Sequence, residues 1–377
     1  MMRQIKNAGF NIVIFQIRPL NDAFYPSKLN PYSRYLTGRE GVGFSDKNFD
    51  PLAFMISETH RFGMEFHAWF NPYRINNGTK LTKQQYLASL SPENFAVKNP
   101  ECVLTVPQKD GKRLLMLDPG HPKVKMFLCN TLREVLENYQ IDAVHLDDYF
   151  YPYSGIGDAD LATYRRYGKS FSSIDDWRRN NVNSQIQIIH SLVRLYSQKK
   201  KTQIRFGISP FGIWANRPLP NSKGKNQKSS STPAVQSHPS GSLTSGMQSY
   251  YAIYADSRKW IKEGWVDYIV PQLYWAFGHE TAPYAALADW WADQVKGTSV
   301  DLYIGHSIYK EGTDGHWQNP GELASQLKYN MLHPEIRGSF FFAARHILSP
   351  ENAIQKKAVQ MVVENLWKCK APFSSSK

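Results

Sequence analysis

The segment Ile141–Pro152, which reads IDAVHLDDYFYP, decides the fold of this chain. It begins with apolar and β-branched residues, as is typical of a buried strand in a parallel sheet. It then runs directly into carboxylates and aromatic side chains. In α/β barrels the functional side chains lie at the carboxyl ends of the strands, so this order of residues predicts a strand that ends at the mouth of a barrel.

Side chains alternate along a strand, and this alternation sorts the polar residues of the segment. His145, Asp147 and Tyr149 share one face. Leu146 and Asp148 share the other, and Leu146 suits a surface that packs against helices. The first face therefore points into the predicted mouth, and Asp147 is the first candidate for a catalytic carboxylate.

Strand-like segments alternate with helix-like segments along the rest of the chain, which indicates parallel βαβ units. The chain opens on a helix that ends near Gly9, so we predict a TIM (β/α)8-type barrel whose first strand is missing from the N-terminus. An open doubly wound sheet is the rival fold, but neither GxGxxG nor GxxxxGK[ST] occurs. The seven expected strands are Asn11–Pro19, Met64–Arg74, Ile141–Pro152, Arg205–Trp214, Val266–Trp275, Asp301–Lys310 and Gly338–Ile347.

We expect one domain over residues 1–377, with two long excursions. Residues 218–246 are rich in Ser, Pro, Gly, Lys and Asn, which predicts a flexible surface insertion. The connection Ile75–Leu117 is expected to lie over the mouth as a lid. Asp118 is predicted to be the N-cap of the next helix, with Pro119 in its first position.

The composition is that of a globular protein, with 42% hydrophobic and 20% charged residues. The formal net charge of +13 favours an anionic partner, but the charge is dispersed, so nucleic acid is the weakest choice. The 3 cysteines show no metal-ligand spacing, and we expect neither a metal nor another cofactor. No apolar run approaches ~18 residues, and the N-terminus is not a signal peptide.

Eight motifs occur in order at the expected strand ends: QIRP, DAFYPS, HAWFNPYR, LDPGHP, VHLDDYFYP, FGISPFGIW, PQLYW and LYIGHSIY. Together they resemble the glycosyl-hydrolase-like family 10 proteins over about Asn11–Leu348. The resemblance implies a (β/α)8 barrel and hydrolysis of peptidoglycan glycan strands stripped of their peptides. It also implies export to the periplasm or cell envelope, with room for a lipid anchor upstream of this chain. Members usually begin with a strand of the type RGVWV, which this chain lacks.

Glycoside hydrolysis usually needs two carboxyl groups, one as acid and the other as nucleophile or base. We expect Asp147 to be the nucleophile or base, and Asp148 to be the acid if the backbone has already turned into the loop there. If the strand stays regular, Asp148 points away and is structural. Asp118, Glu280 and Asp314 are rivals for the acid, which stays unassigned.

Further polar and aromatic residues near strand ends are expected to contact the substrate. Amide and guanidinium groups hydrogen-bond sugar hydroxyls, Arg18 and Arg74 suit the lactyl carboxylate of a muramic acid, and aromatic rings stack on sugars. Trp69 is a weaker candidate, for which core packing is favoured. The expected contacts are Gln16, Arg18, Asn71, Tyr73, Arg74, His145, Tyr149, Trp214, Gln272, Tyr274 and Trp275.

Two other functions stay open. One is a non-catalytic glycan-binding protein, because no Glu stands directly at a strand end. The other is a metal-dependent polysaccharide deacetylase, suggested by the adjacent pair Asp147 and Asp148. Such deacetylase sites add two histidines four residues apart, and none of the 11 histidines has a partner at that spacing.

Overall fold

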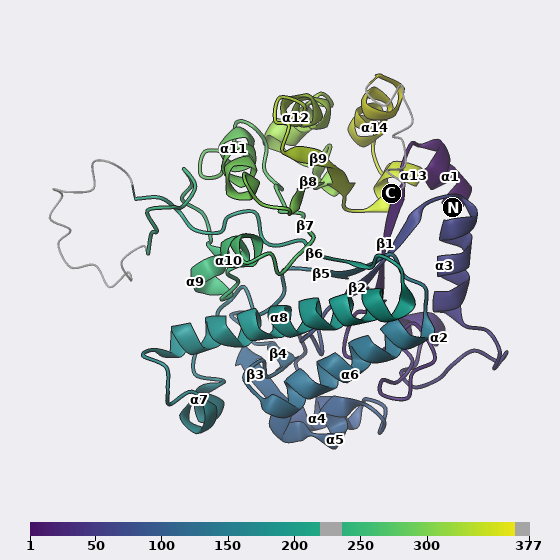
Figure 1. Ribbon diagram of the computed structural model, residues 1–377, viewed down its shortest axis with the longest axis vertical. Helices are drawn as coiled ribbons and strands as arrows, with labels where there is room; N and C mark the ends of the chain where they lie inside the picture. The colour runs from purple at the N-terminus through teal and green to yellow at the C-terminus, as the bar shows by residue number, and fades with distance from the viewer. Residues whose placement is uncertain (219–235, 366–377) are drawn as a thin grey trace, which may run out of the picture. The chain divides into compact units, whose positions relative to one another are not determined.

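The computed structural model describes residues 1–218 and 236–365, drawn in colour in Figure 1. They form two compact units, Met1–Ile208 with Trp265–Tyr268, and residues 209–218 and 236–264 with 269–365. Seven strands follow one another in the hydrogen-bonding order β1-β2-β5-β6-β7-β8-β9, which is also their order along the chain. The expected number of strands and their alternation with helices are thus confirmed.

The first unit holds four of these strands as parallel neighbours. Its strands are β1 (Ile12–Arg18), β2 (Glu65–Phe70), β5 (Ala143–Leu146) and β6 (Arg205–Ile208). Its helices are α1 (Met2–Asn7), α2 (Arg34–Thr37), α3 (Pro51–Arg61), α4 (Lys83–Ala88), α5 (Phe95–Lys98), η1 (Pro100–Cys102), α6 (Pro122–Asn138), α7 (Leu161–Tyr167) and α8 (Ile174–Lys200).

The register of these strands places three side chains that carry polar groups in one row across the sheet. Gln16 on β1 pairs with Trp69 on β2, and Trp69 pairs with His145 on β5. The residues that precede Trp69 and His145 on their strands, Ala68 and Val144, are fully buried. Strand β5 ends at Leu146, so the carboxylates that follow it already belong to the loop.

Helix α6 begins later than predicted. Its first residue is Pro122 and its N-cap is His121, whose side chain accepts from the backbone N–H of Lys123. The prediction of Asp118 as N-cap and Pro119 as first helical residue is wrong. LDPGHP contains two prolines that each satisfy the preference for the first turn, and the second one is used. Figure 1 shows α6 beside α8, where the Lys125 ammonium donates to Ser184 Oγ at 2.9 Å.

The connection predicted as a lid, Ile75–Leu117, is built of regular structure. It contains α4, α5, η1 and an antiparallel pair, β3 (Val103–Pro107) and β4 (Arg113–Leu117), which were not predicted. Bridges from Arg74 to Met116 and from Thr79 to Arg113 fasten the pair to the end of the preceding loop.

The second unit contains the later βα repeats. Its strands are β8 (Asp301–His306) and β9 (Ile336–Phe341), which are parallel, and it also contains Ile269, the second residue of β7 (Tyr268–Ile269). Its helices are α9 (Ser249–Ala252), α10 (Ser257–Lys262), α11 (Tyr284–Val295), η2 (Ile308–Lys310), η3 (Gly315–Gln318), α12 (Glu322–Asn330), α13 (Ala344–Leu348) and α14 (Ala353–Asn365).

The predicted flexible insertion, 218–246, has two parts. Residues 219–235 lie outside the described residues. Residues 236–246 are fastened to the second unit, because Ser242 bridges Asn216 and Gln248 donates to the backbone carbonyl of Gln236 at 2.7 Å. Within the described parts of the chain, no helix combines the length and the apolar character needed to cross a membrane.

Candidate active site

Asp147 stands immediately beyond the last residue of β5 and is 9% exposed. Its carboxylate accepts three hydrogen bonds. Asn71 Nδ2 donates to Oδ2 at 2.9 Å, and Trp69 Nε1 donates to the same oxygen at 3.2 Å. The backbone N–H of Tyr149 donates to Oδ1 at 3.1 Å. Trp69 and Asn71 share one face at the end of β2, so two neighbouring strands converge on this carboxylate as parallel strands in a barrel can.

The electrostatic environment of Asp147 acts in two directions. Burial raises the pKa of its carboxyl above the usual value, because the charged form loses its hydration. The guanidinium of Arg74 and the three hydrogen-bond donors oppose this rise, since they favour the charged form. A carboxylate that is poorly hydrated yet fully hydrogen-bonded is suited to act as a nucleophile or base.

Asn71 is fixed by its own neighbours. Its N–H donates to the carbonyl of Arg18 at 2.9 Å, and its carbonyl accepts from Arg18 Nη1 at 2.6 Å. Its side-chain Oδ1 accepts from the backbone N–H of Arg74 at 3.1 Å. Because that N–H can only donate, the amide must present Nδ2, and not Oδ1, to Asp147.

Arg18 is fully buried and lies beneath this arrangement. Besides Asn71, it donates to the carbonyl of Pro72 at 3.2 Å and to Asn21 Oδ1 at 2.5 Å. Burial lowers its pKa to about 10, so it stays charged at neutral pH. The structure therefore favours a role in positioning Asn71 over the substrate contact expected from the sequence.

Arg74, Tyr149 and Tyr153 form a layered group beside Asp147. The guanidinium of Arg74 lies 3.7 Å from the centre of the Tyr149 ring, an arrangement typical of a cation–π contact. Tyr153 meets Tyr149 edge-on at 5.7 Å and is 46% exposed. Burial raises the pKa of its hydroxyl, and the charge of the buried Asp148 carboxylate, to which the hydroxyl hydrogen-bonds, raises it further. Tyr153 was not among the predicted contacts, although it follows Tyr149 and Tyr151 at the same spacing of two.

His145 belongs to a buried network below the carboxylate. Its Nδ1 lies 3.0 Å from the hydroxyl of Tyr268, which also contacts His67 Nδ1 at 2.9 Å. His67 Nε2 in turn meets Glu65 at 3.0 Å. Burial lowers the pKa of His145 to about 3, so its ring is neutral at ordinary pH. This location favours support of the strand ends over direct contact with a sugar.

Two further predicted contacts from the first unit differ in their surroundings. Tyr73 is fully buried, so its ring offers no surface for stacking. Gln16 is half-buried on β1 and makes no side-chain hydrogen bond among the described residues, so its amide is available to a ligand.

The predicted contacts of the second unit also divide. Trp214 is 2% exposed, donates to Asp256 Oδ1 at 3.1 Å and stacks on Trp290 at 5.9 Å, which favours core packing over a sugar platform. The other three are half-buried residues that follow β7, namely Gln272, Tyr274 and Trp275. Gln272 donates to the carbonyl of Ser209 at 2.9 Å, and these three stay candidates.

The rival acids have very different environments. Asp118 is fully buried, accepts from Thr163 Oγ1 at 2.5 Å and from Gly120 N at 2.9 Å, and burial raises its pKa to about 6. Glu280 and Asp314 are exposed. Glu311, which no sequence pattern indicated, is fully buried after η2, and burial together with the charge of Glu322 raises its pKa to about 8. In the described ranges, no three His, Cys, Asp or Glu side chains gather so as to hold a metal ion.

The family model described as Glycosyl hydrolase-like 10 matches residues 1–320. The chain belongs to this family. It is 42% identical over 354 residues to glycosyl hydrolase YngK of Bacillus subtilis (strain 168), an alignment that covers 92% of this chain and 62% of YngK. It is 38% identical over 360 residues to glycosyl hydrolase DigH of Escherichia coli (strain K12), covering 92% of this chain and 75% of DigH.

Solved structures place this member of the glycosyl hydrolase-like 10 family among barrel folds. The catalytic domain of a β-amylase from Paenibacillus polymyxa matches with a TM-score of 0.55 at 11% identity, over 96% of this chain and 93% of that one. α-L-Fucosidase isoenzyme 2 from Paenibacillus thiaminolyticus matches with a TM-score of 0.51 at 11% identity, over 96% and 45%. At such identities the likeness concerns the fold alone, and it confirms the predicted barrel class. The chain spans less than two thirds of the length of YngK.

Proposed function

We propose that this glycosyl hydrolase-like 10 protein hydrolyses glycosidic bonds, with Asp147 as the carboxylate that attacks the sugar or activates water. The observation that carries the proposal is the environment of Asp147: a buried carboxylate beyond a strand end, held by three donors and lying close to a cation. Donors and charges that are already oriented can stabilise the charge that develops in a transition state. The names of the relatives YngK and DigH support the same reaction class.

Asp148 is the acid that we propose as its partner. It adjoins Asp147, is 5% exposed, and its carboxylate is bonded to the hydroxyl of the exposed Tyr153. A second carboxyl group beside the attacking carboxylate is what glycoside hydrolysis needs to protonate the leaving oxygen. Tyr153 then supplies a ring beside the acid on which a sugar can stack.

The substrate that we propose is peptidoglycan glycan, or a related amino-sugar polymer with acidic groups. Arg74 supports this choice, because its guanidinium forms no ion pair among the described residues while it donates to the neutral Asn77 at 2.9 Å. The carboxylate of a sugar acid would neutralise it with paired hydrogen bonds. The net charge of +13 favours an anionic polymer in the same way. We place the activity in the cell envelope, where such a polymer lies.

The test is release of soluble oligosaccharides from peptide-free peptidoglycan glycan strands, followed by mass spectrometry. Wild type should release muro-oligosaccharides, and Asp147→Asn should release at least ~100-fold less, as expected for loss of a charged catalytic group. Asp142→Asn is the matched control. Asp142 lies just before β5, where its carboxylate accepts from Phe66 N at 2.7 Å, and this change should leave the rate within about twofold.

The outcomes separate the competing functions. Equal release by wild type and Asp147→Asn would remove Asp147 from the mechanism. Binding of the glycan without any product, by a folded wild-type chain, would favour a glycan-binding protein. Activity that EDTA abolishes and zinc restores would favour the metal-dependent deacetylase. A comparison with neutral chitin oligosaccharides tests the role of Arg74. Arg74→Gln should raise KM for the acidic glycan and leave KM for the neutral oligosaccharide unchanged.

A further inference from the structure

The hydrogen bonds that fix Asn71 continue through the interior to the segment that contains α5. We propose that Asn21 and Asn94 are positioning residues, which hold Arg18 and, through Asn71, orient the Asp147 carboxylate. The helix α5 would thereby be fastened to the candidate active site by a buried relay. This inference rests on the proposed function of Asp147 and adds residues that none of the catalytic arguments above requires.

The first link joins Arg18 to Asn21. Arg18 uses Nη1 for the carbonyls of Asn71 and Pro72 and Nη2 for Asn21 Oδ1, at 2.5 Å. Asn21 has a φ of 62°, which lies in the left-handed region that few side chains tolerate. Asn is among the residues that adopt this conformation most readily, so the backbone turns here and brings the amide of Asn21 under the guanidinium.

The second link joins Asn21 to Asn94 through a reciprocal pair of bonds. Asn21 Nδ2 donates to Asn94 Oδ1 at 2.7 Å, and Asn94 Nδ2 donates to the carbonyl of Asn21 at 3.3 Å. Both residues are fully buried. Asn94 is also the N-cap of α5, since its Oδ1 accepts from the backbone N–H of Ala96 at 2.9 Å. The start of α5 and the turn after β1 therefore share one amide.

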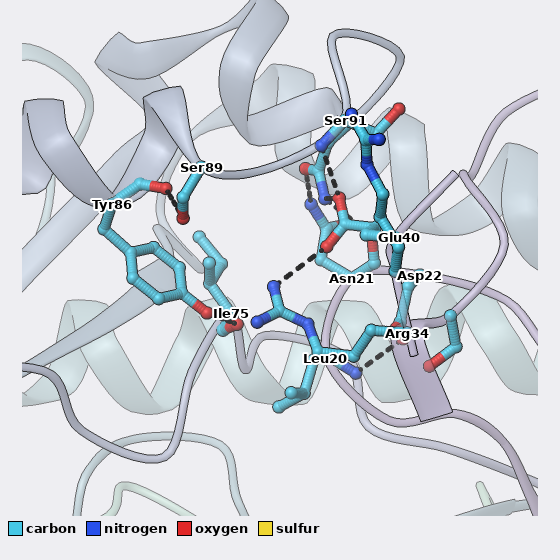
Figure 2. Close-up of polar contacts among 12 residues, drawn as sticks. Leu20, Asn21, Asp22, Arg34, Glu40, Ile75, Tyr86, Ser89 and Ser91 are labelled. Atoms are coloured by element: carbon cyan, nitrogen blue, oxygen red, sulfur yellow. Dashed lines mark hydrogen bonds and ion pairs between the residues drawn. The ribbon is translucent and has the colours of Figure 1, made fainter. Parts of the chain in front are cut away.

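The third link fastens Asn94 to a buried carboxylate, Glu40. Figure 2 shows Glu40 between Arg34 and Ser91. Glu40 Oε1 accepts from Asn94 Nδ2 at 3.0 Å and from Ser91 N at 3.1 Å, and Oε2 accepts from Arg34 at 3.2 Å. Arg34, with a side chain that is 35% exposed, is the outer end of the relay.

The relay is built so that a change at one amide is transmitted to the next. Its inner members lie where water cannot replace a lost partner, and a buried donor without a partner is costly. If Asn21 no longer accepts from Arg18, the guanidinium must turn toward another acceptor. Its remaining bonds to the carbonyls of Asn71 and Pro72 then shift as well. Asn71 moves with its backbone, and the donor that it presents to Asp147 is displaced.

Asn21→Gly tests this relay, because it removes the amide and leaves a residue that adopts a positive φ without strain. We expect kcat on peptide-free glycan strands to fall roughly 2- to 30-fold, as is typical of residues that act through others, while KM stays within about twofold. Lys201→Gly is the matched control. Lys201 also has a positive φ, of 53°, but caps α8 and is exposed, so this variant should match wild type.

A second readout does not depend on activity. The indole N–H of Trp69 donates to Asp147, so its ¹⁵N resonance reports the charge and orientation of that carboxylate. The chain has 10 tryptophans, and Trp69→Phe identifies the resonance by its disappearance. In Asn21→Gly the resonance should move and should titrate at a different pH from that in wild type. A folded Asn21→Gly variant in which kcat and this titration are both unchanged would overturn the relay.

The two readouts separate failure of the relay from failure of the proposed function. If wild type hydrolyses no glycan, the proposed function fails, and the Trp69 resonance alone decides the relay. If Asn21→Gly does not fold, Asn94→Ser replaces it. Serine keeps the cap on Ala96 N but cannot reach Asn21 or Glu40, so the same change of resonance is expected.

Discussion

Trp69→Phe is the sharpest test of the electrostatic account of Asp147, because it removes one donor and keeps an aromatic ring. A hydrogen bond to a charged group contributes ~1.5–3 kcal/mol. The bond from Trp69 Nε1 is 3.2 Å long, which is longer than the ~2.7–2.9 Å of strong charge-assisted bonds, so the lower end of that range applies. One pKa unit corresponds to ~1.36 kcal/mol, and the loss should therefore raise the pKa of Asp147 by about one unit.

The direction of the activity change follows from the form that reacts. In the proposed reaction the carboxylate reacts as nucleophile or base, so the rate should fall as the pH drops through the pKa of Asp147. Burial already raises this pKa, and the loss of a donor to the charged form raises it further. The acidic limb of kcat/KM should thus move to higher pH by about one unit, while the rate above the limb changes much less.

The assay is kcat/KM for peptide-free glycan strands measured between about pH 3.5 and 8, for wild type and variant. Trp290→Phe is the matched control, because the indole of Trp290 donates to the carbonyl of Ser240 at 2.9 Å and not to a carboxylate. Its acidic limb should coincide with that of wild type. An unmoved limb in Trp69→Phe, with the protein folded, would refute the claim that this donor tunes Asp147.

Three further predictions concern stability. Burial raises the pKa of Asp118 from 3.8 to about 6, so its contribution to stability is full below pH 3.8 and is lost as the pH rises through 6. The stability of Asp118→Asn relative to wild type should therefore rise by on the order of 3 kcal/mol between pH 4 and pH 8. An equal Tm difference between variant and wild type at both pH values would contradict this. Arg178 forms a buried ion pair with Asp160 at 2.6 Å, and Arg178→Met should cost ~3–5 kcal/mol in urea unfolding with kcat unchanged. A Cβ on Gly207 would lie 2.0 Å from Cζ of Tyr268, so Gly207→Ala should cost at least ~1–3 kcal/mol; a Tm equal to that of wild type would show that the ring can move.

The fold could be predicted well from the sequence, because it depends on local patterns. Strand β5 is predicted by the apolar residues Ala143, Val144 and Leu146, which precede the carboxylates Asp147 and Asp148. The errors arose where local signals were duplicated. LDPGHP offers two prolines for one helix start, and only the packed structure shows that Pro122 is used.

The candidate site could be predicted only in part. Alternation along β5 placed Asp147 toward the mouth, but it could not reveal the donors to that carboxylate. Asn71 is 76 residues away in sequence and the relay residue Asn94 is 73 residues from Asn21. Residue type alone did not separate the roles of two arginines that were both expected to bind substrate. Arg18 is buried against carbonyls, whereas Arg74 lies on a tyrosine ring and stays a candidate for binding substrate.

The contrast between these two arginines bears on how the proposed reaction could use a buried carboxylate. An ion pair with Asp147 would satisfy its charge and make it a poor nucleophile, and no such pair involves Arg18 or Arg74 among the described residues. Nη1 and Nη2 of Arg18 donate to two backbone carbonyls and to an amide oxygen. These bonds fix the geometry without placing the charge of Arg18 on the carboxylate. Arg74 acts on Asp147 through space, which limits the rise in pKa while leaving its guanidinium able to bind an anion. Geometry and charge are thus supplied by different residues, so variants of Arg18 and Arg74 should separate kcat effects from KM effects.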